Sequence, residues 1–127
     1  MNAEIRSPAP AAEFSTPENC HILELANLPG DPDCSIARAR VEPGATTRWH
    51  RLAGTAERYV ILAGRGRAEI GDLPPRAVAP GDVVLIPPGV RQRIANTGPG
   101  DLVFLAICTP RFRPEHYADI DSAPRRA

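Results

Sequence analysis

Two side chains near the middle of the chain, His50 and Glu57, have the types and the spacing for chemistry on a small molecule. They lie on what look like two short neighbouring strands, with Gly44 before the first and Gly64 after the second. An imidazole and a carboxylate can bind a divalent metal together, or they can form a buried pair that needs no metal. Both interpretations are open at this point.

Strand alternation extends this pair to a candidate cavity. Side chains two residues apart on a strand share a face, so Arg48 should point the same way as His50, and Tyr59 the same way as Glu57. Gln92 is expected on the opposite wall. The predicted ligand-binding residues are Arg48, Tyr59 and Gln92, and the predicted metal ligands are His50, Glu57 and Gln92.

Each of these polar side chains also has a purely structural interpretation. Arg48 could hold a substrate carboxylate or phosphate, or it could pair with Glu57 or form a salt bridge at the rim. The Tyr59 hydroxyl could donate to a ligand, or the ring could be a core aromatic with a polar tip. The neutral amide of Gln92 is a poorer ligand than an imidazole, which favours weak over tight binding of a metal such as Zn, Mn, Ni or Fe.

The composition excludes several classes of function. A chain of 127 residues suffices for one domain with one core. The formal net charge is zero with acids and bases interspersed, so neither a nucleic acid nor a membrane is expected as a partner. All fifteen basic residues are Arg, which excludes a lysine Schiff base and pyridoxal-phosphate (PLP) chemistry. Three cysteines, no apolar leader and no apolar run of spanning length favour a soluble cytoplasmic protein.

Short segments bounded by Gly or Pro follow one another through most of the chain and predict an all-β sandwich or barrel. The runs 83–86 and 102–108 are continuously apolar, which is typical of strands buried on both faces. Residues 1–17 are expected to form a flexible N-terminal arm, residues 18–112 the barrel, and residues 113–127 a helical turn with a frayed tail. The predicted strands span 20–26, 35–42, 50–52, 57–63, 67–70, 76–79, 83–86, 91–96 and 102–108.

The two Gly-bounded stretches, 44–64 and 81–96, resemble the paired motifs of the cupin superfamily. The matching positions are Gly44, His50, Glu57 and Gly64 in the first motif and Gly81, Pro87, Gly89 and Asn96 in the second. The resemblance implies a double-stranded β-helix, or jelly-roll, barrel. It also implies a metal site of three histidines and a glutamate, in which Leu52 and Gln92 replace two of the histidines.

The phrase around Glu57 is similar to the small cupins described as like mannose-6-phosphate isomerase, although Arg48 stands where those proteins have a further Gln ligand. The resemblance implies a small-molecule-binding cupin that isomerises, epimerises or decarboxylates a sugar-derived or carboxylic acid metabolite with the help of a metal. The alternatives are a non-catalytic binding or sensing module without metal, and a purely structural dimer. Outward apolar rows on the strands predict a homodimer in any of these cases.

Overall fold

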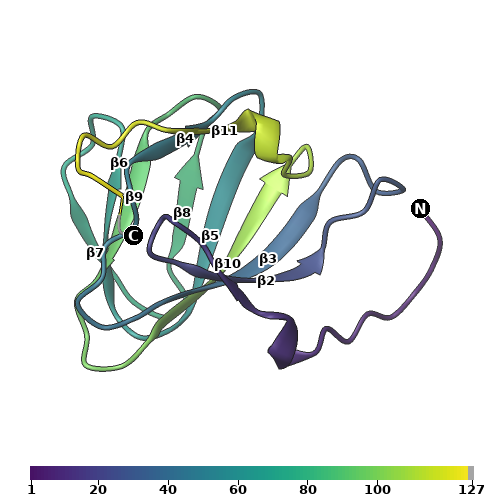
Figure 1. Cartoon of the computed structure of the whole chain (residues 1–127), viewed down its shortest axis with the longest axis horizontal. Helices are drawn as coiled ribbons and strands as arrows, with labels where there is room; N and C mark the ends of the chain where they lie inside the picture. The colour runs from purple at the N-terminus through teal and green to yellow at the C-terminus, as the bar shows by residue number, and fades with distance from the viewer. Residues whose placement is uncertain (126–127) are drawn as a thin grey trace.

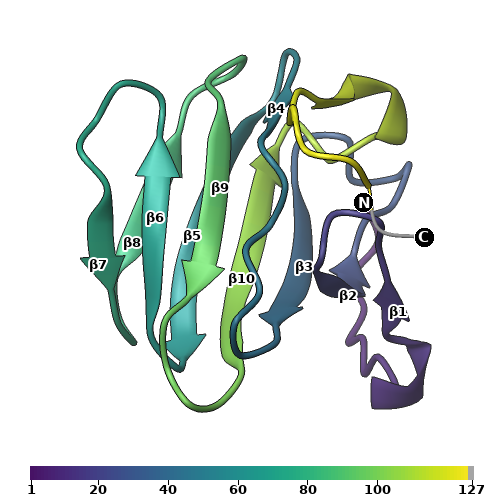
Figure 2. The same cartoon turned by 60° about the vertical axis from the view of Figure 1, so that its left-hand side comes forward.

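The computed structural model describes residues 1–125, which form two antiparallel β-sheets packed face to face (Figure 1, Figure 2). In order across the six-stranded sheet lie β1 (Phe14–Ser15), β2 (His21–Ala26), β3 (Ser35–Val41), β10 (Leu102–Thr109), β5 (Ala56–Ala63) and β8 (Val83–Ile86). In order across the five-stranded sheet lie β11 (Tyr117–Asp119), β4 (His50–Leu52), β9 (Gln92–Asn96), β6 (Gly66–Ile70) and β7 (Arg76–Val78). The predicted all-β barrel is confirmed.

The core lies between the two sheets because alternate residues of the central strands point inward. On β10, Leu102 and Phe104 are buried, and on β9, Ile94 is fully buried. The ring of Tyr59 on β5 packs against Phe104 with 4.4 Å between the ring centroids. Removal of this apolar surface from water stabilises the barrel and fixes which face of each strand is available for a site.

The strand β8 corrects the expectation that the run 83–86 is buried on both faces. It lies at the edge of the six-stranded sheet, where Val83 and Leu85 are 56% and 67% exposed and only Val84 and Ile86 face the core. A short apolar run does not distinguish a doubly covered strand from an edge strand with an apolar outer face. On the central strand β10, the outward residues are half-buried rather than buried.

The two ends of the chain add short strands that the sequence pattern did not predict. The short 3-10 turn η1 (Pro10–Ala12) precedes β1, which pairs with β2. The turn η2 (Pro114–His116) lies where the sequence predicted a helical turn, and it precedes β11, which pairs with β4. The domain boundaries at residues 18 and 112 remain a prediction, and the predicted tail includes residues 126 and 127, which lie outside the described residues. Among residues 1–125, no helix is long and apolar enough to cross a membrane.

One motif glycine has a clear structural role. Gly64 closes β5 with φ at +83°, a conformation that L side chains rarely adopt. A Cβ atom at this position would also lie inside contact distance of the carbonyl oxygen of Asp101. The glycine therefore allows β5 to turn tightly against the start of β10.

Candidate functional site

His50 presents one ring nitrogen for chemistry because the other is already engaged. Its Nδ1 donates to the backbone carbonyl oxygen of Arg48 at 2.7 Å. A carbonyl can only accept, so the neutral ring carries its proton on Nδ1 and leaves Nε2 unprotonated. The ring is 6% exposed and stacks on Tyr117 with 5.3 Å between centroids. His50 thus offers a base or a metal ligand at Nε2.

Glu57 approaches from the other sheet, which corrects the expectation that His50 and Glu57 lie on neighbouring strands. The strand β4 belongs to the five-stranded sheet and β5 to the six-stranded sheet. Cys108, the register partner of Glu57 on β10, donates to Glu57 Oε2 at 3.6 Å. The other oxygen, Oε1, is buried without a hydrogen-bond partner among the described residues. Burial raises the pKa of the Glu57 carboxyl, and the nearby His50 only partly offsets this effect.

Gln92 lies beside His50 rather than on the opposite wall, because β4 and β9 are neighbours and these two residues are register partners. Across the barrel, the Tyr59 hydroxyl donates to Gln92 Oε1 and bridges the two sheets. Burial raises the pKa of Tyr59 well above its usual value, which keeps the hydroxyl protonated as a donor. The amide nitrogen of Gln92 has no partner in the part of the chain that the structure describes.

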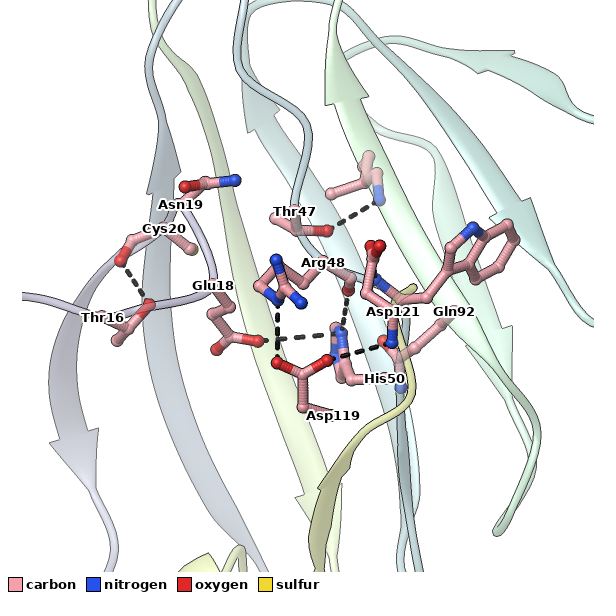
Figure 3. Close-up of polar contacts among 12 residues, drawn as sticks. Thr16, Glu18, Asn19, Cys20, Thr47, Arg48, His50, Gln92, Asp119 and Asp121 are labelled. Carbon is pink, nitrogen blue, oxygen red and sulfur yellow. Dashed lines mark hydrogen bonds and ion pairs between the residues drawn. The ribbon is translucent and has the colours of Figure 1, made fainter. Parts of the chain in front are cut away.

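Arg48 is held by the C-terminal segment at the rim (Figure 3). Its Nε donates to Asp119 Oδ2 at 2.8 Å, and its two terminal nitrogens donate to the carbonyl oxygens of Pro124 and Ala123 at 3.1 and 2.6 Å. The bond from Arg48 lowers the pKa of Asp119 to about 2. This is the rim salt bridge among the alternatives above, and a ligand-binding role for Arg48 remains a prediction.

A cavity of about 150 Å³ lies between His50 and Glu57. Its apolar lining includes Leu52, Ala106 and Phe112, and its polar lining includes Glu18, Glu24, Ser35, Cys108 and Tyr117. Of the five predicted site residues, His50 and Glu57 line this cavity, whereas Arg48, Tyr59 and Gln92 are not among its lining residues. The structure therefore brings His50 and Glu57 together at one cavity, and the other three predicted site residues lie outside its lining.

Glu18 and Tyr117 are site residues that sequence reasoning missed. Glu18 precedes β2, and its Oε2 lies 3.7 Å from His50 Nδ1 (Figure 3). That oxygen is buried with no hydrogen-bond partner among residues 1–125. Burial and the nearby Glu18 carboxylate raise the pKa of Tyr117. Neither residue belongs to a periodic pattern that would predict its position. The sequence shows only that Glu18 follows a Pro-rich segment and that Tyr117 follows a turn.

The side chains around the cavity do not form a complete metal site in this arrangement. Leu52 has no donor atom, and the Gln92 oxygen already accepts from Tyr59, so His50 Nε2 and Glu57 Oε1 are the acceptor atoms of the four motif ligand positions left without a hydrogen bond among the described residues. Within the described residues, no three His, Cys, Asp or Glu side chains are grouped closely enough to hold a metal ion. Two protein donors bind a divalent metal weakly.

The sequence of this chain is similar to known proteins. Residues 37–108, more than half of the chain, match the family described as "Cupin domain". An oxalate-binding protein of Thermotoga maritima is 38% identical over 74 residues, which cover 57% of this chain and 59% of that protein. The matched part is thus less than two thirds of the length of this curated relative.

Solved structures share the fold over a larger part of the chain. A predicted oxalate decarboxylase from Thermotoga maritima superposes with a TM-score of 0.66 at 28% identity, covering 72% of this chain and 80% of that one. The Streptomyces nucleoside dehydratase Pac13 superposes with a TM-score of 0.75 at 13% identity, covering 93% and 92%. At such low identity, the second similarity concerns the fold alone.

Proposed function

Since this chain belongs to the cupin family, we propose that it binds a small polar metabolite in the cavity between its sheets and moves a proton on that metabolite. The observation that carries the proposal is the pair of free atoms in one cavity, the unprotonated Nε2 of His50 and the unpartnered Oε1 of Glu57. Concave, mostly apolar sites with a few convergent polar groups are typical of small-ligand binding.

The two side chains suit opposite roles in proton transfer. In its neutral form, His50 can accept a proton at Nε2 from a carbon or oxygen of the substrate, while the bond from Nδ1 to the Arg48 carbonyl holds the ring in place. Glu57, whose protonated form is favoured by burial, can donate a proton to a substrate oxygen opposite. Such a pair supports isomerisation or epimerisation of a sugar-derived metabolite.

A metal-assisted site is the second candidate. It is supported by the fact that the two free donors, His50 Nε2 and Glu57 Oε1, belong to the two retained ligand positions of the cupin motif. A Zn, Mn, Ni or Fe ion would polarise a substrate carbonyl as a Lewis acid, which suits decarboxylation of a carboxylic acid. The similarity to an oxalate-binding protein supports this class of ligand.

Ligand-detected NMR in D₂O distinguishes these candidates. The protein is treated with EDTA and mixed with a library of sugar-derived metabolites and small carboxylic acids. We expect binding that survives EDTA, deuterium incorporation at a carbon of the bound ligand, and loss of that incorporation in His50→Ala and Glu57→Gln. Binding that returns only with added Zn²⁺ or Mn²⁺ would favour the metal-assisted site. Binding without deuterium incorporation in any ligand would indicate a non-catalytic binding or sensing module.

The proposal also includes a homodimer in the cytoplasm. The dimer is supported by exposed apolar side chains on the outer face of the six-stranded sheet, among them Leu62, Val83 and Leu85. The cytoplasmic location is supported by three free cysteines, of which Cys20 and Cys108 are buried.

A further inference from the structure

We propose that the cavity selects a compact ligand carrying an ammonium group and rejects carboxylate ligands such as oxalate. The inference rests on the proposed binding function and names its ligand class. It differs from the oxalate ligand that similarity to the oxalate-binding relative would suggest for this chain.

The first observation is an excess of acidic groups around the cavity. Glu18, Glu24 and Glu57 all line it. Glu57 is 9% exposed, and its Oε1 has no hydrogen-bond partner within the described chain. The buried Oε2 of Glu18 is unpartnered in the same part of the chain. The Gln92 amide acts on the pKa of Glu57, and Glu18 acts on that of Tyr117, yet each of these two oxygens can accept a further hydrogen bond, which a ligand with N–H groups would supply.

The second observation is that, among the described lining residues, His50 is the one basic side chain facing three carboxyl groups, and its Nδ1 lies 3.7 Å from Glu18 Oε2. No arginine is found among the described residues that line the cavity, and the chain contains no lysine. Arg48 lies two residues before His50, but its guanidinium is held by Asp119 and two carbonyl oxygens. Arg125 lines a neighbouring surface depression that also includes Glu18 and Tyr117, and it is paired with Asp119 at 3.0 Å.

These surroundings favour a cation and disfavour an anion. A ligand carboxylate would add a further anion beside Glu18 and Glu24, whereas a ligand cation would stabilise the ionised form of Glu57, which burial disfavours in the empty cavity. An ammonium group brings three donors, enough for both unpartnered oxygens, and the Tyr117 ring on the wall can attract the positive charge. A volume of about 150 Å³ suits a ligand of a few heavy atoms, about the size of benzene.

A series of probes with one two-carbon backbone and different charges tests the inference. Ethanolamine, ethylene glycol and oxalate are titrated into EDTA-treated protein, and binding is followed by amide chemical shifts. We expect ethanolamine to bind at least tenfold more tightly than ethylene glycol, and oxalate to show no saturation. Glu57→Gln and Glu18→Gln should each weaken ethanolamine binding at least tenfold. Glu115→Gln, on an exposed turn away from the cavity, is the matched control and should change nothing.

The outcomes separate this inference from the proposed function. Oxalate binding more tightly than ethanolamine would overturn the inference but leave the binding function intact. Ethanolamine binding that is unchanged in both Glu→Gln variants would overturn it as well. Glu18 is only half-buried and precedes β2, so its variant is informative even if Glu57→Gln fails to fold. Failure of all three probes and of the metabolite library would remove the proposed function together with the inference.

Discussion

Leu52 is a cavity residue that has no donor atom for a metal ion. It is 3% exposed, lines the cavity two residues after His50, and stands where the cupin motif has a second histidine. Strand alternation placed His50, Leu52 and Glu57 inward correctly, because burial of one residue fixes the face of its strand neighbours.

Restoring a histidine at this position should create a third donor. We expect Leu52→His to raise affinity for Zn²⁺ at least tenfold, measured by competition with a chromogenic chelator. Leu62→His places the same side chain on the outer face of β5, where Leu62 is 48% exposed, and should give no gain. Equal affinities in the two variants would show that the geometry of the site is not that of a cupin metal centre.

The Tyr59 to Gln92 bridge is a second feature at this scale, and alternation could not predict it. Alternation shows that both residues point inward, but their contact depends on how the two sheets face each other. We expect Tyr59→Phe to lower the free energy of unfolding by about 1 to 2 kcal/mol, because the buried Gln92 oxygen loses its donor. Urea denaturation measures this change. Tyr59→Phe combined with Gln92→Leu should recover part of the loss, since both polar partners are then removed.

At the scale of elements, β11 and the segment that follows it hold one side of the site. The sequence pattern indicated only a turn here, because three residues with no periodicity carry no strand signal and the strand exists through its pairing with β4. The segment is attached by the Arg48 to Asp119 ion pair and by the bond from the Trp49 amide to Asp121 at 2.8 Å.

This attachment should be sensitive to acid. Pairing with Arg48 lowers the pKa of Asp119 from 3.8 to about 2, so the ion pair stabilises the fold above pH 3.8 and its contribution is lost as the pH falls through about 2. We expect the fluorescence of Trp49 to change over this range as the segment detaches. Asp119→Asn should remove the transition, whereas Asp72→Asn, at a fully exposed carboxylate, should retain it.

The turn after β5 gives a prediction at the same scale. Gly64→Ala should lower the free energy of unfolding by about 2 to 3 kcal/mol, because alanine disfavours a positive φ and its Cβ meets the Asp101 backbone. Gly30→Ala is the control, since Gly30 has open space around it and no positive φ. Equal stability of the two variants in thermal denaturation would contradict this role for Gly64.

At the scale of the whole molecule, the fold was the property that the sequence predicted best. The paired glycine motifs identified the barrel, since each motif glycine marks a turn between strands. They could not identify Glu18, because a residue in a Pro-rich segment is placed by tertiary packing rather than by local pattern.

The outer face of the six-stranded sheet carries the prediction of a homodimer. Leu85 on β8 is 67% exposed, and light scattering at micromolar concentration should give twice the mass of the chain. Leu85→Glu should produce a monomer, because a charge on that face opposes apolar contact between two copies. Leu73→Glu, on a turn outside this sheet with 69% exposure, should leave the mass unchanged. A monomeric wild-type protein would remove the dimer from the proposal.

The Tyr59 to Gln92 bridge also bears on the direction in which a bound ligand can be longer. The bridge joins the two sheets outside the cavity lining, whereas Glu18 and Tyr117 line both the cavity and the neighbouring surface depression, so a longer ligand can extend past them. Chemical elaboration of any bound probe should therefore be tolerated better at the end facing these two residues than at the end facing the bridge.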